Sequence, residues 1–406
     1  MKRLWTSPTL RSMAVYGASG AGFAGANLVL ARVLPTEPYA LFTLVIALGN
    51  LAVSLAPAGL DGVVNRRHLD AGPPLLRSVL RTATLVGLVF AAIAIAAYDM
   101  SWPLAAMLFA STAAGGAMMV AGARFQSEQR FGVSLALLQS PNIVLLLAAA
   151  VTAAGHMTQA WPAVLVSTLG FVVAAAWGWR VLLREHDARP AGATTFHWSE
   201  ALSFAGLGAS GLLLVQLERL MIPHALPLAD LALYGVLGAI VGSLFRVLQM
   251  GVGFSLLPRL RAARTVPERR RLVAHEARLV GAIVLGGSAL IWFLTPLVER
   301  WFLAGKYHLA GTLVLAAIVS GIGKIANAFT KAIATALGDP RELSLVNFGG
   351  WVSVAASIAG GFVGARWGLT GLIYGVALGW FLRAAIAAVL MVRHLRLPVT
   401  IPVTAA

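Results

Sequence analysis

Long apolar segments separated by short polar ones run along the chain from about residue 10 to residue 392. A helix of about 20 apolar residues crosses roughly 30 Å of hydrocarbon, and backbone polar groups in lipid must be satisfied within the segment itself. The pattern therefore predicts an all-α membrane protein with about twelve transmembrane helices. Their expected ranges are 10–34, 37–60, 78–98, 102–122, 132–154, 159–183, 201–223, 231–257, 275–298, 310–336, 343–363 and 369–392.

A polar stretch near the middle of the chain divides six predicted spans from six. It contains Pro190 and Gly192, and it predicts a cytoplasmic linker over residues 184–199. The flanking regions then form an N-terminal six-helix lobe over 1–183 and a C-terminal six-helix lobe over 200–406. A short echo between Ala31–Pro35 and Glu218–Pro223 fits a duplication of this kind.

Composition supports membrane embedding. Hydrophobic residues make up 59% of the 406 residues and charged residues only 11%, with a mean hydropathy of +0.83. A soluble domain carries about 25% charged residues, so this chain has too little polar surface to face water all round. The absence of cysteine excludes disulfides, thiolate metal sites and cysteine nucleophiles.

The net charge of +16 has an uneven distribution. Most of the 31 Lys and Arg residues flank the spans on the side of the N-terminus, and the opposite side holds Arg32, Arg300, Lys306 and Arg366. This bias predicts that both termini are cytoplasmic. It also accounts for most of the net positive charge as a topology signal, so nucleic acid is not expected as a partner. The basic loop 258–278 either attracts anionic lipid or phosphate, or only anchors the topology.

Charged residues inside predicted spans are candidates for function, because a charge at the bilayer centre costs at least a few kcal/mol. The second half of the chain holds all six, and cations outnumber carboxylates five to one. A cavity with this balance would favour an anionic guest such as a phosphate or pyrophosphate group. The six residues are Glu218, Arg219, Arg246, Lys324, Lys331 and Arg383.

Arg246 and Lys324 are the central candidates for binding. Gly242, Ser243 and Gln249 share a helical face with Arg246, and this small polar face suits a wet cavity, although a structural arginine is the alternative. Lys324 belongs to a stripe of polar residues at spacings of four, three and four. The stripe consists of Ser320, Lys324, Asn327 and Lys331.

The other charges have two interpretations each. Lys331 and Arg383 either line the cavity or extend to an interface. Glu218 and Arg219 adjoin in the chain and do not face each other, so they form either structural contacts between helices or a proton or sodium site at Glu218.

Other chemistry is not expected from this chain. It has no Gly-rich Lys-Ser/Thr phosphate loop and no zinc-type His-Glu pattern. The loops predicted outside the membrane are also too short for a catalytic domain. We therefore predict that the protein is not an enzyme, with no catalytic residue, metal or cofactor.

Four motifs resemble the polysaccharide-transport branch of the multidrug/oligosaccharidyl-lipid/polysaccharide (MOP) flippase superfamily, which includes the O-antigen flippases. Ala40 and Glu218 depart from the glycine and aspartate that are usual in that branch. The motifs are Leu30–Pro35 with Glu37 and Tyr39, Gln216–Met221 followed by Tyr234 and Gly235, Leu257 with Pro258, and Gly305–Tyr307.

The resemblance implies two six-helix lobes around a central cavity and transport by alternating access. It also implies a flippase that moves a polyprenyl-pyrophosphate-linked oligosaccharide from the inner to the outer leaflet of a bacterial inner membrane, for surface polysaccharide biosynthesis. Arg246, Lys324, Lys331, Arg383 and Asn327 would bind this substrate. Membrane lipids, and a polysaccharide polymerase or other assembly proteins, would be partners. The multidrug branch often binds a cation through an acidic residue in its first lobe, and no such residue lies in the first six spans here.

Two alternatives remain open from the sequence. One is a secondary transporter that exports a soluble organic anion or drug. The other is a non-transporting membrane scaffold for a glycan assembly complex, which would tolerate substitutions at Arg246 and Lys324.

Overall fold

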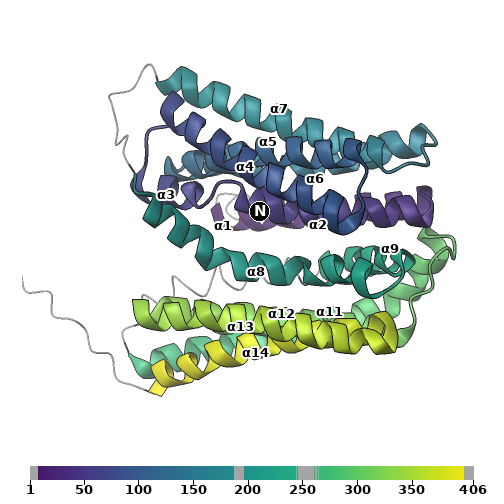
Figure 1. The fold of residues 1–406 in the computed structure, drawn as a ribbon. Coiled ribbons are helices and arrows are strands. Elements are labelled where there is room, and N and C mark those ends of the chain that lie inside the picture. Colours follow the sequence, from purple (N-terminus) through teal and green to yellow (C-terminus); the bar gives the residue numbers. More distant parts are fainter. Residues whose placement is uncertain are drawn as a thin grey trace, which may run out of the picture. The chain divides into compact units, whose positions relative to one another are not determined.

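A computed structural model describes residues 8–186, 196–243, 245, 260, 263 and 265–396. These residues form helices joined by short connections, as Figure 1 shows. The chain divides into two compact units, Met1–Ala239 (unit 1) and Ile240–Ala406 (unit 2).

The described residues of unit 1 form nine α-helices. They are α1 (Pro8–Val33), α2 (Thr36–Leu55), α3 (Leu60–Arg67), α4 (Pro73–Tyr98), α5 (Trp102–Ser127), α6 (Phe131–Ala154), α7 (Trp161–His186), α8 (Trp198–Ala225) and α9 (Leu228–Leu237). A π-helical turn, Gly238–Gly242, follows α9 at the border of the unit.

Helix α5 is the centre of unit 1, because it packs against α2, α3, α4, α6 and α7. Small residues permit this close packing. A Cβ atom on Gly116 would lie 2.6 Å from the Cβ of Ala56 in the segment after α2. The indole of Trp179 in α7 donates to the carbonyl of Ala117 at 2.9 Å, which satisfies a buried donor within the bundle.

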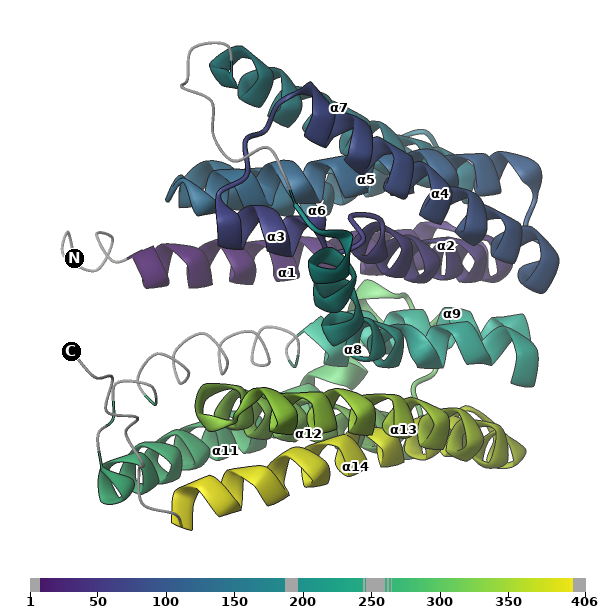
Figure 2. The same cartoon turned by 60° about the vertical axis from the view of Figure 1, so that its left-hand side comes forward.

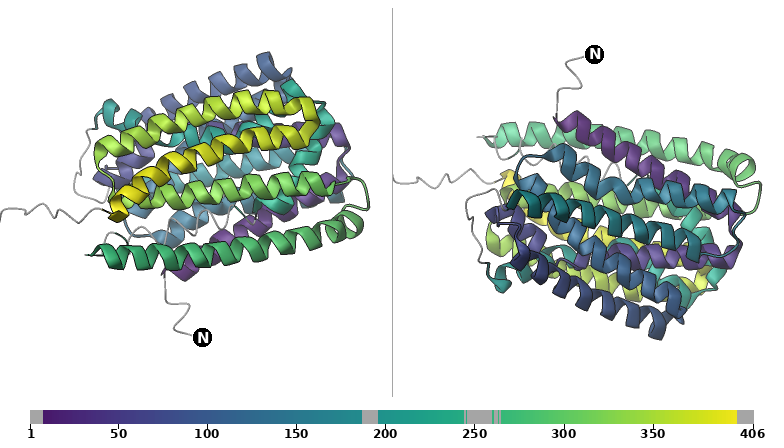
Figure 3. Two further views of the ribbon diagram at one scale, coloured as in Figure 1. Left: turned by 90° about the horizontal axis from the view of Figure 1, so that it is seen from below. Right: turned by 90° about the horizontal axis from the view of Figure 1, so that it is seen from above.

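Unit 2 contains α11 (Val266–Leu297), α12 (Gly311–Leu337), α13 (Pro340–Gly364) and α14 (Gly368–Arg396). A π-helical turn, Val298–Phe302, extends α11, and a 3-10 turn, Ala365–Trp367, joins α13 to α14. Helix α14, yellow in Figure 3, packs along both α12 and α13 and makes only brief contact with α11.

The α13–α14 hairpin is held by glycines that face each other. A Cβ atom on Gly360 would lie 2.6 Å from the carbonyl oxygen of Gly375, and Gly364 and Gly371 meet in the same way. Ser357 adds a hydrogen bond across the hairpin, since its hydroxyl donates to the carbonyl of Val376 at 2.9 Å. Association of helices in lipid depends on such close packing of small residues.

The predicted all-α membrane fold is confirmed. Every predicted span overlaps a helix. Of the span expected at 231–257, the structure describes α9 and the π-helical turn after it, and most of the remainder lies outside the described residues. Within the described part of the chain, nine helical segments are long and apolar enough to cross a membrane when α13 and α14 count as one, and Leu228–Gly242 is a shorter apolar helix. The division into lobes at residues 184–199 and the central cavity stay predictions.

Helix α3 was not predicted from the sequence. The expected span 37–60 ends early at Leu55, and a turn leads into the short helix (Figure 2). Gly59 makes this turn possible, because it has a φ of +82° and any Cβ atom there would collide with the backbone of Ala201 in α8. The salt bridge from Arg67 to Glu200 at 2.7 Å further ties α3 to α8.

Helix α11 begins nine residues before the predicted start of its span at residue 275. Thr265 caps its first turn, with the hydroxyl accepting from the backbone N–H of Glu268 at 3.3 Å, and Pro267 occupies the first turn. A threonine followed by proline and then glutamate at the third helical position is a helix-start signal. Part of the predicted basic loop is therefore helical.

Asp61, in the first turn of α3, provides a test of how this helix packs. Burial raises the pKa of its carboxyl, while hydrogen bonds from the backbone at Gly62 and at Asp61 itself oppose this effect. A raised folded-state pKa means that the folded protein loses stability as the pH rises through that pKa. We expect Asp61→Asn to raise the thermal unfolding temperature at neutral pH, and the difference from wild type to shrink in acid. An equal or lower unfolding temperature at neutral pH would contradict this account.

Candidate functional site

The predicted polar stripe lies along α12 in unit 2. Ser320 and Asn327 are buried, and Lys324 and Lys331 are half-buried. Residues three and four apart in a helix share one face, so the four side chains form a continuous polar strip within an otherwise apolar helix. The strip places two cations within a helix that is long and apolar enough to cross a membrane.

Lys324 is positioned by Trp380 of α14. The Lys324 ammonium lies 5.8 Å from the centroid of the Trp380 ring, a cation–π geometry, and the tryptophan is only 1% exposed. Gly323 allows the two helices to approach, because a Cβ atom there would lie 3.1 Å from the Cβ of Trp380. The indole ring therefore holds the ammonium by a cation–π contact, and such a contact leaves the positive charge of Lys324 in place.

Arg383 adds a third cation to the same side of unit 2. It lies three residues after Trp380, so the two side chains share a face of α14, and Arg383 is only 2% exposed. The like charges of Arg383 and Lys331 repel each other. Burial of two repelling cations is unfavourable by itself, and an anion near them would relieve the repulsion.

Two polar atoms beside Lys324 have unused hydrogen-bonding capacity. Asn327 Oδ1 lies one helical turn along α12, and Trp380 Nε1 belongs to the ring under the ammonium. Both atoms are buried, and neither has a hydrogen-bond partner among the described residues. Buried polar groups are normally satisfied, so these two atoms indicate a place for water or a polar ligand.

Glu218 and Arg219 lie on α8 in unit 1, and both are buried. The Arg219 guanidinium donates to the side-chain oxygen of Gln216 at 3.1 Å and lies 5.8 Å from the ring centroid of Tyr234 in α9. A Cβ atom on Gly238 would lie 3.0 Å from Arg219 Nη2. These contacts agree with a structural role for Arg219, and the role of Glu218 in proton or sodium binding stays a prediction.

Arg246, a central candidate from the sequence, lies outside the described residues. Of the other predicted residues, Lys324, Asn327, Lys331 and Arg383 lie on the neighbouring helices α12 and α14 of unit 2. Glu218 and Arg219 belong to unit 1. We refer to Lys324, Asn327, Lys331, Trp380 and Arg383 as the cationic face.

Trp380 is the member of the cationic face that sequence reasoning missed. A signal for it was present, because tryptophan in membrane helices favours the interfaces and Trp380 lies near the middle of its span. Its contact with Lys324, by contrast, depends on how α12 and α14 are rotated against each other.

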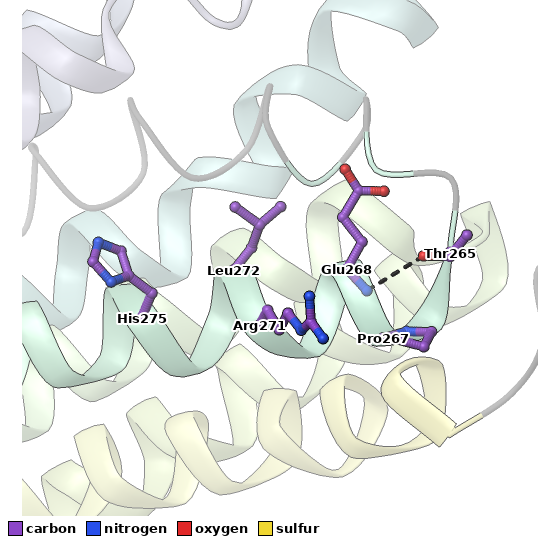
Figure 4. A pocket seen from close by; sticks show the side chains of 6 residues that line it. All are labelled: Thr265, Pro267, Glu268, Arg271, Leu272 and His275. Carbon is purple, nitrogen blue, oxygen red and sulfur yellow. Dashed lines mark hydrogen bonds between the residues drawn. The ribbon is translucent and has the colours of Figure 1, made fainter.

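A second polar region lies at the start of α11, where the predicted basic loop meets the helix. A cavity of about 420 Å³ is lined there by Thr265, Pro267, Glu268, Arg271, Leu272 and His275 (Figure 4). Arg271 and His275 are one helical turn apart and exposed. Arg270 donates to the carbonyl of Leu395 at 2.8 Å and so ties α11 to the end of α14. Anchoring of the topology and attraction of anionic groups both stay open for this loop.

No protein-family model matches the sequence, and no curated protein matches it. Solved structures do share its fold. A multidrug resistance MATE family transporter of the MOP superfamily, in an inward-facing conformation, matches with a TM-score of 0.66 and 14% identity over 94% of each chain. The lipid II flippase MurJ matches with a TM-score of 0.64 and 11% identity over 94% of this chain and 87% of its own.

A eukaryotic MATE transporter, AtDTX14, matches with a TM-score of 0.54 and 14% identity over 95% of each chain. At these identities the likeness shows the fold and nothing finer. The chain shares the helical fold of these two MATE transporters and of the flippase MurJ.

Proposed function

We propose that this protein is a flippase that carries a polyprenyl-pyrophosphate-linked oligosaccharide from the inner to the outer leaflet of a bacterial inner membrane. The observation that carries the proposal is the cationic face of unit 2. Lys324, Lys331 and Arg383 are held at membrane depth there, beside buried polar atoms of Asn327 and Trp380 that have no hydrogen-bond partner among the described residues. A pyrophosphate supplies negative charge for the cations and acceptor oxygens for the Trp380 Nε1–H donor. Asn327 Oδ1 is an acceptor, so it would take a donor such as a sugar hydroxyl or water.

The fold supports this proposal, since one structural neighbour is a flippase for a lipid-linked substrate, lipid II. In the proposed mechanism Arg246 and Lys324 hold the pyrophosphate, with Lys331, Arg383 and Asn327 around it. The sugar occupies a polar cavity between two six-helix lobes, and rocking of the lobes exposes the cavity to each side in turn. Glu218 and Arg219 serve either ion coupling or packing.

The second candidate is export of a soluble organic anion or drug, because other neighbours are multidrug transporters. Those neighbours have the same fold, so fold does not separate the two functions. The cationic face favours an anionic cargo in either case.

Reconstituted vesicles distinguish the candidates. We expect the purified protein to make a polyprenyl-pyrophosphate oligosaccharide, loaded in one leaflet, accessible to a glycosidase on the other side. Vesicles without protein, and vesicles with the free oligosaccharide pyrophosphate as a soluble anion, are the controls. Transport of the soluble anion without translocation of the lipid-linked form would favour the exporter. Activity with neither cargo, under all tested ion gradients, would favour a scaffold.

A further inference from the structure

An apolar groove runs along the α13–α14 hairpin and is completed by Val319 of α12. Its volume is about 550 Å³. The glycines of the hairpin, among them Gly360, Gly364 and Gly371, form part of its lining. Because glycine has no side chain, the closely packed backbone of the two helices forms the floor of the groove.

The walls of the groove are large apolar side chains that other helices leave uncovered. Trp367 is 72% exposed, Leu378 is 62% exposed, and Phe381 is also exposed. Each of them belongs to the turn before α14 or to α14 itself, which is a membrane-spanning helix. An exposed face of a membrane-spanning helix contacts lipid instead of water. The molecule available to fill the groove is therefore a lipid, through one of its hydrocarbon chains.

The length of the groove fits one leaflet. Gly371 and Phe381 are ten residues apart on α14, which corresponds to about 15 Å of helix and about half the hydrocarbon thickness. Trp367 marks the interfacial end, as tryptophans do in membrane helices. The groove therefore extends from one interface to about the middle of the membrane, the depth that a single acyl chain occupies.

A positively charged residue, Arg366, lies at the interfacial end of the groove. Arg366 is exposed and directly precedes Trp367. It is one of the four basic residues that the charge bias of the sequence predicts on the outer side of the membrane. A phosphate group at the level of the headgroups would lie within its attraction.

We propose that the α13–α14 groove binds an outer-leaflet anionic glycerophospholipid, with one acyl chain along the glycine floor and the phosphate at Arg366. The site is separate from the cationic face in its residues, because none of the side chains that line the groove belongs to that face. It therefore does not depend on the proposed transport function. A bound lipid would cover the part of the hairpin where glycines leave the backbone without side chains.

The direct test uses phosphatidylglycerol with a diazirine at the end of one acyl chain, in nanodiscs that contain the full-length protein. After irradiation, peptide mapping is expected to place adducts at the deep end of the groove, around Leu378 and Phe381. Leu378→Trp fills the groove and is expected to lower this labelling about tenfold, since several buried methylene contacts are lost. Val389→Trp is the matched control, because Val389 is 70% exposed on the same helix beyond the groove.

The headgroup is tested through Arg366. Arg366→Gln is expected to lower the preference for phosphatidylglycerol over phosphatidylcholine about fivefold, which corresponds to one basic residue near an anionic surface. Arg366→Lys should retain the preference. Equal labelling along all exposed faces of α14, or loss of labelling in Val389→Trp as large as in Leu378→Trp, would overturn the proposal. Preferential labelling by a diazirine polyprenyl phosphate against excess phosphatidylglycerol would instead assign the groove to the isoprenoid chain and refute the phospholipid assignment.

Discussion

Lys324→Gln is expected to slow the appearance of lipid-linked oligosaccharide in the outer leaflet about ten- to a hundredfold. This range corresponds to one charge-assisted hydrogen bond, about 1.5–3 kcal/mol. Glutamine keeps much of the length and polarity of lysine but removes the charge that lies above Trp380. A combined Lys324→Gln and Lys331→Gln variant is expected to lose still more, because two of the cations near Arg383 are then absent.

The controls separate charge from packing. Lys324→Arg retains a cation above the indole and should retain most transport, and Trp380→Phe retains a ring for that cation. Arg246→Gln tests the remaining candidate of the proposed site. Membrane levels and thermal unfolding of each variant are measured in parallel. If the Lys324→Gln and Lys331→Gln double variant is present at normal levels and transports at the wild-type rate, the cationic face does not bind the cargo.

Gly375→Val is expected to have the largest effect on stability. A Cβ atom at this position would collide with the backbone of Gly360, and a backbone cannot rotate away as a side chain can. Overpacking of a tight interface typically costs about 1–3 kcal/mol and occasionally more. Here we expect the upper end of this range, because relief requires that α13 and α14 separate along their shared glycine contacts.

Gly286→Val is the matched control for Gly375→Val. Gly286 lies in α11, another membrane-spanning helix, and a Cβ atom there would have nothing within 4 Å. The measurement is the thermal unfolding temperature of the purified proteins in the same lipid nanodiscs. Gly375→Ala should fall between wild type and Gly375→Val. Equal unfolding temperatures for the two valine variants would show that the α13–α14 contact does not limit stability.

Part of the candidate site could be predicted from the sequence. The spacing of Ser320, Lys324, Asn327 and Lys331 follows the helical repeat, so their common face needed no knowledge of neighbouring helices. The high cost of charge at membrane depth also singled out Arg383 before its burial was known. The mid-span position of Trp380 was a signal that was overlooked. Its contact with Lys324 could not be predicted, because an apolar span gives no sign of which of its residues another helix will contact.

The sequence by itself determined that the chain is a bundle of membrane-spanning helices, and where most of them begin and end. The bilayer imposes this result, since only helices of a certain apolar length satisfy their backbone within lipid. It did not determine the turn at Gly59 with the short α3, the pairing of Gly360 with Gly375, or the position of Lys324 above Trp380. These features join residues that are distant in the chain, and a helix that is apolar on every side carries no periodic signal of its rotation. Close packing between helices decides that rotation, so only the tertiary structure reveals it.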